Sequence, residues 1–153
     1  RYFTHYGPAT LQDASYYLGK SQTQVRRWME RLPLNDFSLE GEVFFYAGSL
    51  PSAVPETPAC LLAAGFDPLL LGYEKKRNPV LPAPYLRNIF SLSGIVMAPV
   101  LLQGRIVGRW KRQKNGISIS LFETVSRANR ELMEQTAVAA AGPVKRIRIE
   151  EPQ

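Results

Sequence analysis

The chain has 153 residues and a mass of 17.2 kDa, enough for one domain of ordinary size or two small ones. With 45% hydrophobic and 21% charged residues, its composition is that of a globular protein and excludes an intrinsically disordered one. The longest uncharged stretch, residues 88–104, is broken by serines and a proline, so we expect no membrane-spanning helix. No signal peptide opens the chain, and we expect a cytoplasmic protein.

Cysteine and histidine each occur once, at Cys60 and His5. A single cysteine allows no internal disulfide. One cysteine and one histidine are too few ligands for a Cys/His zinc site, and we expect neither a metal nor a cofactor. A Cys60–His5 nucleophile pair is conceivable. We interpret Cys60 instead as a small core residue beside Leu61 and Leu62, and His5 as a solvated helix residue.

The formal net charge of +6 is unevenly distributed along the chain. Residues 1–50 have a net charge of 0, residues 51–103 of +1 and residues 104–153 of +5. A positive charge concentrated in one region favours a polyanionic partner, with nucleic acid first among the candidates. A merely solvated basic surface would give the same composition.

The first 20 residues predict two helices. Residues 1–6 have the pattern of the last turns of a helix that Gly7 and Pro8 end. Because this helix starts without an N-cap, we expect a C-terminal piece of a longer protein. Thr10 has N-cap chemistry and Asp13 suits the positive end of the second helix, which Gly19 ends. Its expected buried stripe is Leu11, Ala14, Tyr17 and Leu18.

A third helix and a hairpin follow. Ser21 and Gln24 have the spacing of a capping box, and Pro33 ends the helix. Its expected buried face is Val25, Trp28, Met29 and Leu32. Residues 37–39 and 43–46 read as two strands around a turn at Gly41. This order predicts a winged helix over residues 1–46, in which the third helix is the recognition helix.

Residues 47–59 contain three prolines and are expected to form a linker, and a β-rich domain is expected over residues 60–153. Its strands are predicted at 60–64, 96–102, 105–112 and 117–121, with tight turns at Gln103-Gly104 and Asn115-Gly116. A helix from Ser126 to Ala141 and an edge strand over 145–149 follow. The predicted fold class is therefore α+β: a winged helix followed by a small antiparallel β-barrel-like domain with a C-terminal helix.

The last hairpin predicts where its side chains point. If Asn115-Gly116 is the two-residue loop, Lys114 opposes Ile117. The core face then carries Ile106, Trp110, Ile117, Ile119 and Leu121. The other face carries Arg109, Lys111, Ser118 and Ser120, with no carboxylate opposite them. Arg112 and Lys114 fall on the core side near the tip, where they can reach water.

Two motifs suggest a family. They are Phe66-Asp67-Pro68-Leu69-Leu70-Leu71-Gly72-Tyr73 and Gly104-Arg105-Ile106-Val107-Gly108-Arg109-Trp110, after a winged helix that opens with Gly7-Pro8-Ala9-Thr10. This order resembles the C-terminal half of the YcaQ/AlkZ family of bacterial winged-helix DNA glycosylases. The resemblance implies tandem winged helices followed by a small β-barrel, acting on double-stranded DNA. It also implies metal-independent excision of alkylated bases and unhooking of interstrand crosslinks.

The family's catalytic signature is a Gln-x-Gln or Gln-x-Asp in the first winged helix, which we expect to lie upstream of this chain. Gln22-Thr23-Gln24 has the same letters, but it lies in the third helix and the capping box explains Gln24. We interpret Asp67, which precedes a proline, as a turn former. No catalytic residue is therefore assigned, and the fragment alone is expected to be inactive.

The function expected from these features is that of the DNA-binding C-terminal portion of such a glycosylase in DNA repair. The alternative is a non-enzymatic winged-helix transcription regulator, and a small-molecule enzyme with its pocket in the barrel is a third reading. The expected DNA contacts are basic or amide side chains on the third helix and the last hairpin: Lys20, Gln22, Arg26, Arg27, Arg105, Arg109, Lys111, Arg112 and Lys114.

Overall fold

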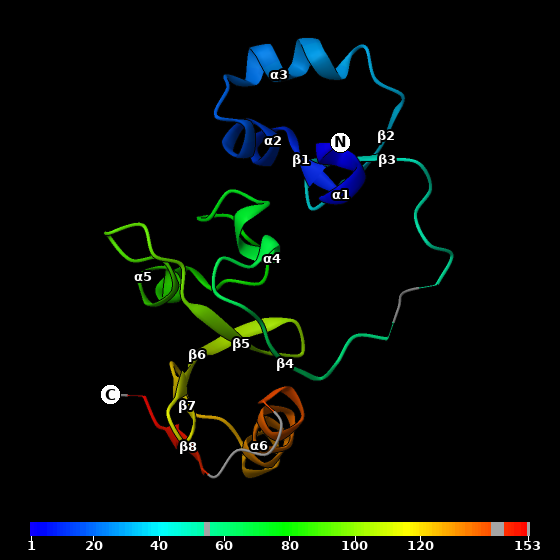
Figure 1. The fold of residues 1–153 in the computed structure, drawn as a ribbon. Coiled ribbons are helices and arrows are strands. Elements are labelled where there is room, and N and C mark those ends of the chain that lie inside the picture. Colours follow the sequence, from blue (N-terminus) through cyan, green and yellow to red (C-terminus); the bar gives the residue numbers. More distant parts are fainter. Residues whose placement is uncertain (54–55, 142–145, 153) are drawn as a thin grey trace. The chain divides into compact units, whose positions relative to one another are not determined.

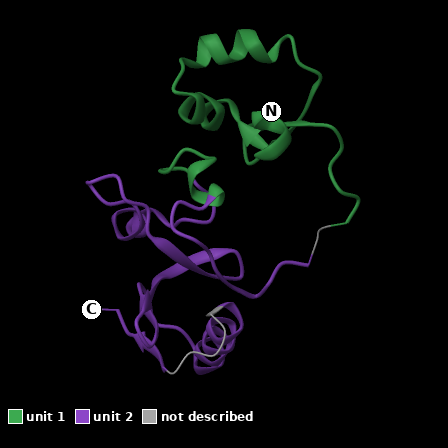
Figure 2. Cartoon of the chain, viewed as in Figure 1, with its two compact units in different colours: residues 1–55, 68–77 green, residues 56–67, 78–153 purple. Residues whose placement is uncertain are grey.

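The computed structural model describes residues 1–53, 56–141 and 146–152 of a mixed α/β chain. The chain divides into two compact units, which Figure 2 shows in separate colours. The first unit comprises residues 1–55 and 68–77, and the second comprises residues 56–67 and 78–153. The boundaries differ from the expected division into residues 1–46, 47–59 and 60–153, because a short segment beyond residue 60 belongs to the first unit.

The first unit combines short helices with a three-stranded antiparallel sheet of strand order β1-β3-β2. Its small core is built around Tyr2, Phe3, Ala9, Ala14 and Val25. Its elements, labelled in Figure 1, are α1 (Tyr2–His5), β1 (Ala9–Thr10), α2 (Leu11–Leu18), α3 (Gln22–Met29), β2 (Leu34–Leu39), β3 (Glu42–Ala47) and α4 (Pro68–Leu71).

The helix starts predicted from capping chemistry are confirmed. The Thr10 hydroxyl accepts a hydrogen bond from the backbone N–H of Asp13, and the Asp13 carboxylate accepts one from the backbone N–H of Thr10. Gly19 ends α2 in the left-handed conformation, with φ of 61°. The Ser21 hydroxyl accepts from the backbone N–H of Gln24 at 3.3 Å, so Ser21 is the N-cap of α3, but only this half of the capping box predicted for Ser21 and Gln24 is formed.

The predicted buried faces of α2 and α3 are wrong at their ends. Ala14 and Val25 are buried, but Tyr17, Trp28 and Leu32 are 44%, 42% and 50% exposed. The reason is the size of the unit, because helices of eight residues cover a small core only at their centres.

Residues 68–77 are held in the first unit by hydrogen bonds to its N-terminal helices. The Tyr2 hydroxyl donates to the carbonyl oxygen of Gly72 at 2.7 Å, and the backbone N–H of Glu74 donates to the Asp13 carboxylate at 2.9 Å. A side chain at position 72 would overlap the ring of Tyr6, so this approach requires glycine. These contacts join residues about 60–70 positions apart, which local sequence patterns do not report.

The second unit is an open five-stranded sheet of strand order β4-β5-β6-β7-β8, with β4 and β8 at its edges. The expected barrel is therefore wrong, and so is a purely antiparallel sheet, because β8 pairs with β7 in parallel. A connection through a helix allows this direction. The elements are β4 (Cys60–Leu62), η1 (Ala83–Tyr85), α5 (Leu86–Ile89), β5 (Ala98–Leu102), β6 (Arg105–Gln113), β7 (Gly116–Leu121), α6 (Arg127–Ala141) and β8 (Arg146–Glu150).

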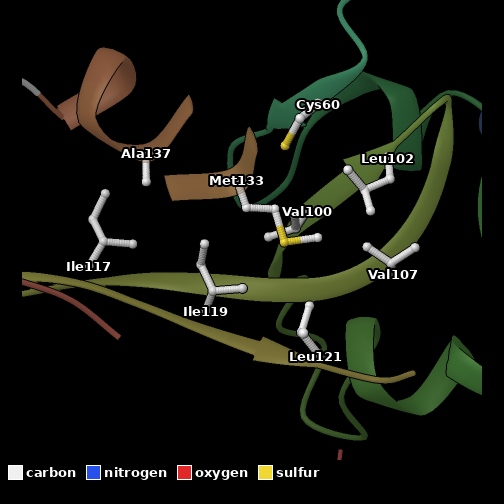
Figure 3. Packing of buried hydrophobic residues seen from close by; sticks show 9 residues of the cluster. All are labelled: Cys60, Val100, Leu102, Val107, Ile117, Ile119, Leu121, Met133 and Ala137. Carbon is white, nitrogen blue, oxygen red and sulfur yellow. The ribbon is translucent and has the colours of Figure 1, made fainter. Parts of the chain in front are cut away.

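Helix α6 covers one face of this sheet and completes its core. Figure 3 shows Met133 and Ala137 of α6 directed toward Ile117 and Ile119 of β7, and all four are at most 2% exposed. Cys60 of β4 lies in the same cluster, as expected of a core cysteine. Burial raises the pKa of its thiol, which disfavours the nucleophilic thiolate.

A β-bulge changes which side chain of β6 enters this core. Val100 pairs with Gly108 whereas Leu101 pairs with Ile106, so Val107 is the extra residue. Val107 therefore packs in the cluster in place of the expected Ile106, which is fully buried outside it.

The hairpin register also differs from the expected one. Gln113 pairs with Gly116, so the two turn residues are Lys114 and Asn115 rather than Asn115 and Gly116. Each paired residue of β6 therefore faces a β7 residue two positions earlier than expected. Because the difference is an even number, the side chains of the hairpin stay on their expected faces of the sheet. Gly116 serves a different purpose from a turn glycine, because a Cβ there would overlap the carbonyl oxygen of Arg146 on β8. The predicted tight turn at residues 103–104 is confirmed.

The C-terminal elements agree in part with expectation. The Ser126 hydroxyl accepts from the backbone N–H of Asn129 and starts α6. Arg127 pairs with Glu131 of the same helix at 2.9 Å, and Arg130 pairs with Glu151. The predicted end of the helix at Gly142-Pro143 lies outside the described residues, as does Lys145 of the predicted edge strand.

Candidate nucleic-acid interface

The candidate interface is the face of the second unit's sheet opposite α6, along β6, β7 and β8. We call it the polar sheet face. Cross-strand pairing defines two rows on it: Arg109, Ser120 and Glu150 form one, and Lys111, Ser118 and Arg148 form the other. The alternation of β7 requires this arrangement, because Ile117, Ile119 and Leu121 face the core.

The cations of the polar sheet face are exposed and weakly paired. Arg109 donates to the backbone oxygen of Asn88 at 3.4 Å. Arg148 pairs with Glu150 at 3.2 Å, but the two side chains are 72% and 41% exposed, so the pair contributes little stability. Within residues 1–53, 56–141 and 146–152, neither Arg109 nor Lys111 forms an ion pair. A guanidinium and an ammonium therefore remain available to an external anion.

The serines of this face differ from each other. Ser120 donates to the Glu150 carboxylate at 3.2 Å. Ser118 is 2% exposed, and its hydroxyl has no hydrogen-bond partner among the described residues. The expectation that no carboxylate faces these side chains is wrong, because parallel β8 brings Glu150 beside Ser120. The positive charge is consequently weighted toward the row of Lys111 and away from Glu150.

A polar cavity of about 770 Å³ lies along the Glu150 end of the polar sheet face, lined by Tyr85, Asn88, Arg109, Arg148 and Glu150 among others. The Tyr85 hydroxyl donates to the Glu123 carboxylate at 2.6 Å, and this hydrogen bond raises the pKa of Tyr85.

The remaining predicted cations of the hairpin, Arg105, Arg112 and Lys114, have different surroundings. Arg105 is paired with Glu123 at 2.7 Å, which reduces its availability to DNA. Arg112 pairs across the strands with Ile117 and lies on the core side, as expected, and Lys114 lies in the turn. All three side chains are exposed.

The predicted contacts on and beside α3 are exposed, and the acidic residue that shares a cavity with them, Glu42, is paired with Arg77. Lys20, Gln22, Arg26 and Arg27 are all exposed, and the Gln22 amide donates to the Gln12 side chain. A cavity of about 330 Å³ is lined by Gln22 and Arg26 together with the turn between β2 and β3. The two strands and their turn carry three carboxylates and no lysine or arginine: Asp36, Glu40 and Glu42.

Sequence reasoning did not place Arg146 and Arg148 beside the cations of the β6–β7 hairpin. The alternation of charge and isoleucine in this segment predicted an edge strand, and β8 is one. Parallel pairing with β7 then places Arg148 beside Ser118. The alternating pattern of these residues predicted the strand, but it did not show that the strand pairs with β7.

The described residues contain no group of three or more histidines, cysteines, aspartates or glutamates that could hold a metal ion. Across the same residues, every helix is too short or too polar to span a bilayer.

Comparison with known proteins identifies the family. Residues 1–142 match the family described as "DNA glycosylase AlkZ-like". The chain is 29% identical over 157 aligned positions to an "Interstrand DNA cross-link repair glycosylase" of Streptomyces sahachiroi, covering 95% of this chain and 42% of the relative. The solved structure of Streptomyces sahachiroi DNA glycosylase AlkZ matches with a TM-score of 0.76 and 25% identity, over 98% of this chain and 43% of that one. The chain thus spans less than half the length of these relatives, and it belongs to the AlkZ-like DNA glycosylase family.

Proposed function

We propose that this chain is the DNA-binding portion of an AlkZ-like DNA glycosylase and that it holds duplex DNA through the polar sheet face. The observation that carries the proposal is the placement of Arg109, Lys111 and Arg148 on one exposed face of neighbouring strands. Contacts to phosphates position a duplex without reading its sequence, which suits an enzyme that searches for damage.

Backbone contacts of this kind also fit the chemistry of base excision. An enzyme that extrudes a damaged base spends a few kcal/mol on unstacking and needs compensating contacts elsewhere on the duplex. The full-length relative from Streptomyces is described as a cross-link repair glycosylase, and this chain corresponds to 42% of it. We propose repair of alkylated or crosslinked DNA as the role of the parent enzyme.

We propose that the first unit is a winged helix in which α3 is the recognition helix and β2 and β3 form the wing. The element order α1-β1-α2-α3-β2-β3 and the sheet order β1-β3-β2 support this proposal. Because the charged side chains of the wing are all acidic, the cations on or beside α3 are assigned a secondary contact to DNA. They are Lys20, Arg26 and Arg27, with Gln22 as a neutral donor.

We further propose that catalysis belongs to residues outside this chain. Gln22-Thr23-Gln24 lies at the start of α3, where Ser21 caps the backbone of Gln24. Cys60 is buried with a raised pKa, so it is unsuited to act as a nucleophile. The chain is expected to bind duplex DNA and to release no base from it.

The proposal is tested by the salt dependence of duplex binding. The chain is titrated into a fluorescein-labelled 20-base-pair duplex at 50–300 mM KCl, and affinity is read from fluorescence anisotropy. About five phosphate contacts predict a log–log slope of about −4 to −5. Replacing Arg109 and Lys111 together by glutamine should reduce its magnitude by about 2.

A matched control separates this effect from the loss of net charge. Replacing Arg31 and Arg127 by glutamine removes the same charge from exposed positions outside the polar sheet face. The control should keep the wild-type slope. A flat salt response of the wild-type chain, or equal slopes for both double variants, would contradict the proposal. An ordered footprint on one palindromic sequence would favour a transcription regulator instead.

A further inference from the structure

A second, smaller cavity lies at the end of the β6–β7 hairpin, where β8 begins. Its volume is about 260 Å³. We call it the hairpin-end pocket, and it is lined by Gln113, Lys114, Asn115, Gly116, Ile117, Arg146 and Arg148. Among these described residues are three cations and two side-chain amides, and none is a carboxylate. The pocket therefore combines a positive charge with neutral hydrogen-bond donors.

The backbone brings these cations together. Gly116 pairs with Arg146 in the parallel ladder, and a Cβ on residue 116 would overlap the Arg146 carbonyl oxygen. The glycine thus allows β8 to start directly beside the turn that carries Lys114. Two positions further along, Arg148 pairs with Ser118 and points to the same side of the sheet as Arg146.

Little within the described chain offsets this charge. Arg146 is exposed, and neither it nor Lys114 forms an ion pair within the described residues. Arg148 has an exposed partner in Glu150, which lies farther along β8 and does not line the pocket. Like charges gathered around a concavity repel one another, and a bound anion removes that repulsion. An arrangement of this kind is suited to an anion.

The size of the pocket restricts which anion it can hold. Small-molecule sites usually occupy about 300–1,000 Å³, so this pocket is small for a nucleoside. A tetrahedral phosphate with a few waters fits, at about 30 Å³ for each water. Arginine matches the oxygen geometry of phosphate with paired donors, and lysine adds a point charge.

We infer that the hairpin-end pocket binds a phosphate group of the DNA backbone, held by Arg146 and Arg148 with Lys114 at its rim. The inference rests on the proposed DNA-binding function and extends the contact surface from Arg148 to Arg146 and Lys114, which did not carry that proposal. The hairpin-end pocket and the polar sheet face share Arg148, so one strand of the duplex can follow both. Gln113 and Asn115 are the neutral donors available to the same phosphate.

The test compares the Lys114→Gln, Arg146→Gln double variant, which leaves Arg109, Lys111 and Arg148 in place, with the Arg31→Gln, Arg127→Gln control in the anisotropy titration. Each phosphate contact contributes about 0.9 to the slope, so losing these two cations should reduce its magnitude by about 1 while the control stays unchanged. Circular dichroism of each variant verifies the fold. If the double variant matches the control, the inference is overturned and the proposed function stands.

A second measurement keeps the two proposals apart. Inorganic phosphate is titrated into the ¹⁵N-labelled chain, and the backbone amide signals of residues 113–117 are followed by NMR. Saturable shifts in the wild-type chain that are absent from the double variant support an anion site. If phosphate shifts these signals but duplex DNA does not bind, the pocket takes a free phosphate and the assignment to DNA is overturned. If neither ligand shifts them, the inference is wrong.

Discussion

Asp13 joins the start of α2 to the segment of residues 68–77 in the first unit. Its carboxylate accepts from the backbone N–H and the hydroxyl of Thr10, at 3.0 and 2.6 Å, and from the backbone N–H of Glu74 at 2.9 Å. The side chain is 8% exposed. Replacing Asp13 by alanine therefore removes half of the capping box and one of the hydrogen bonds that hold residues 68–77 in a single change.

The expected cost can be estimated from these contacts. Loss of an N-cap interaction costs about 1 kcal/mol, and each hydrogen bond to a buried charged acceptor contributes about 1.5 kcal/mol or more. We expect Asp13→Ala to lower the free energy of unfolding by about 3–4 kcal/mol. Asp13→Asn preserves the shape and one acceptor oxygen, so its cost should be roughly half as large. The exposed Asp36→Ala change on β2 serves as the control, with an expected effect below about 0.5 kcal/mol.

The assay combines urea denaturation with hydrogen–deuterium exchange of the peptide covering residues 68–77. Asp13→Ala should lower the urea midpoint and raise exchange at Glu74, because its amide loses its acceptor. The Asp36→Ala control should leave both unchanged. If Asp13→Ala gives wild-type stability and wild-type exchange over residues 68–77, then this segment is not held as the structure describes.

Three further substitutions test the packing. Ser118→Ala removes a buried hydroxyl that has no partner among the described residues, so urea melts should show unchanged or slightly higher stability; a loss above about 1 kcal/mol would reveal a missed hydrogen bond. Gly116→Ala should displace β8 because of the overlap with Arg146, costing about 2 kcal/mol or more in thermal melts, and normal stability would contradict the register. Burial raises the pKa of Tyr2, so its neutral form is favoured in the folded state; stability should hold below about pH 10 and fall above it. Tyr2→Phe should cost about 1 kcal/mol at pH 8 through the lost bond to Gly72 and flatten that alkaline fall, whereas an unchanged fall would contradict the assignment.

The predictions that succeeded rest on local chemistry. Thr10 and Ser21 cap helices through bonds to residues three positions away, so a short window contains the whole interaction. The turn at Gln103-Gly104 succeeded for the same reason, since its two residues have φ of 48° and 77°. The strict alternation of residues 117–121 fixed which side chains face the core, and a register error of two left that assignment intact.

The predictions that failed depend on partners far away in the chain. A barrel requires the edge strands to pair with each other, and nothing in the sequence of β8 shows that it pairs in parallel with β7 instead. The bulge opposite Val100 places Val107 in the cluster beneath α6 and leaves Ile106, which is also fully buried, outside that cluster, although both are β-branched and equally suited to it. The exposure of Trp28 depends on how much neighbouring structure covers α3, which periodicity alone does not measure.

The same distinction applies to the candidate interface. Arg109 and Lys111 are two positions apart on one strand, so their common face follows from the alternation of β6 alone. Arg148 joins them only through the β7–β8 pairing, and Arg105 is reduced in importance by its pair with Glu123. The part of the candidate interface that lies within the β6–β7 hairpin was therefore predictable from the sequence, and the part that lies on β8 was not.

The central claim is that the second unit holds duplex DNA, and lysine footprinting tests it most directly. The chain is acetylated briefly with and without a saturating 20-base-pair duplex, and each lysine is quantified by mass spectrometry. The account predicts several-fold protection of Lys111 and Lys114, with the exposed Lys76 of the first unit unchanged. Equal reactivity of Lys111 in free chain and in verified complex would contradict it.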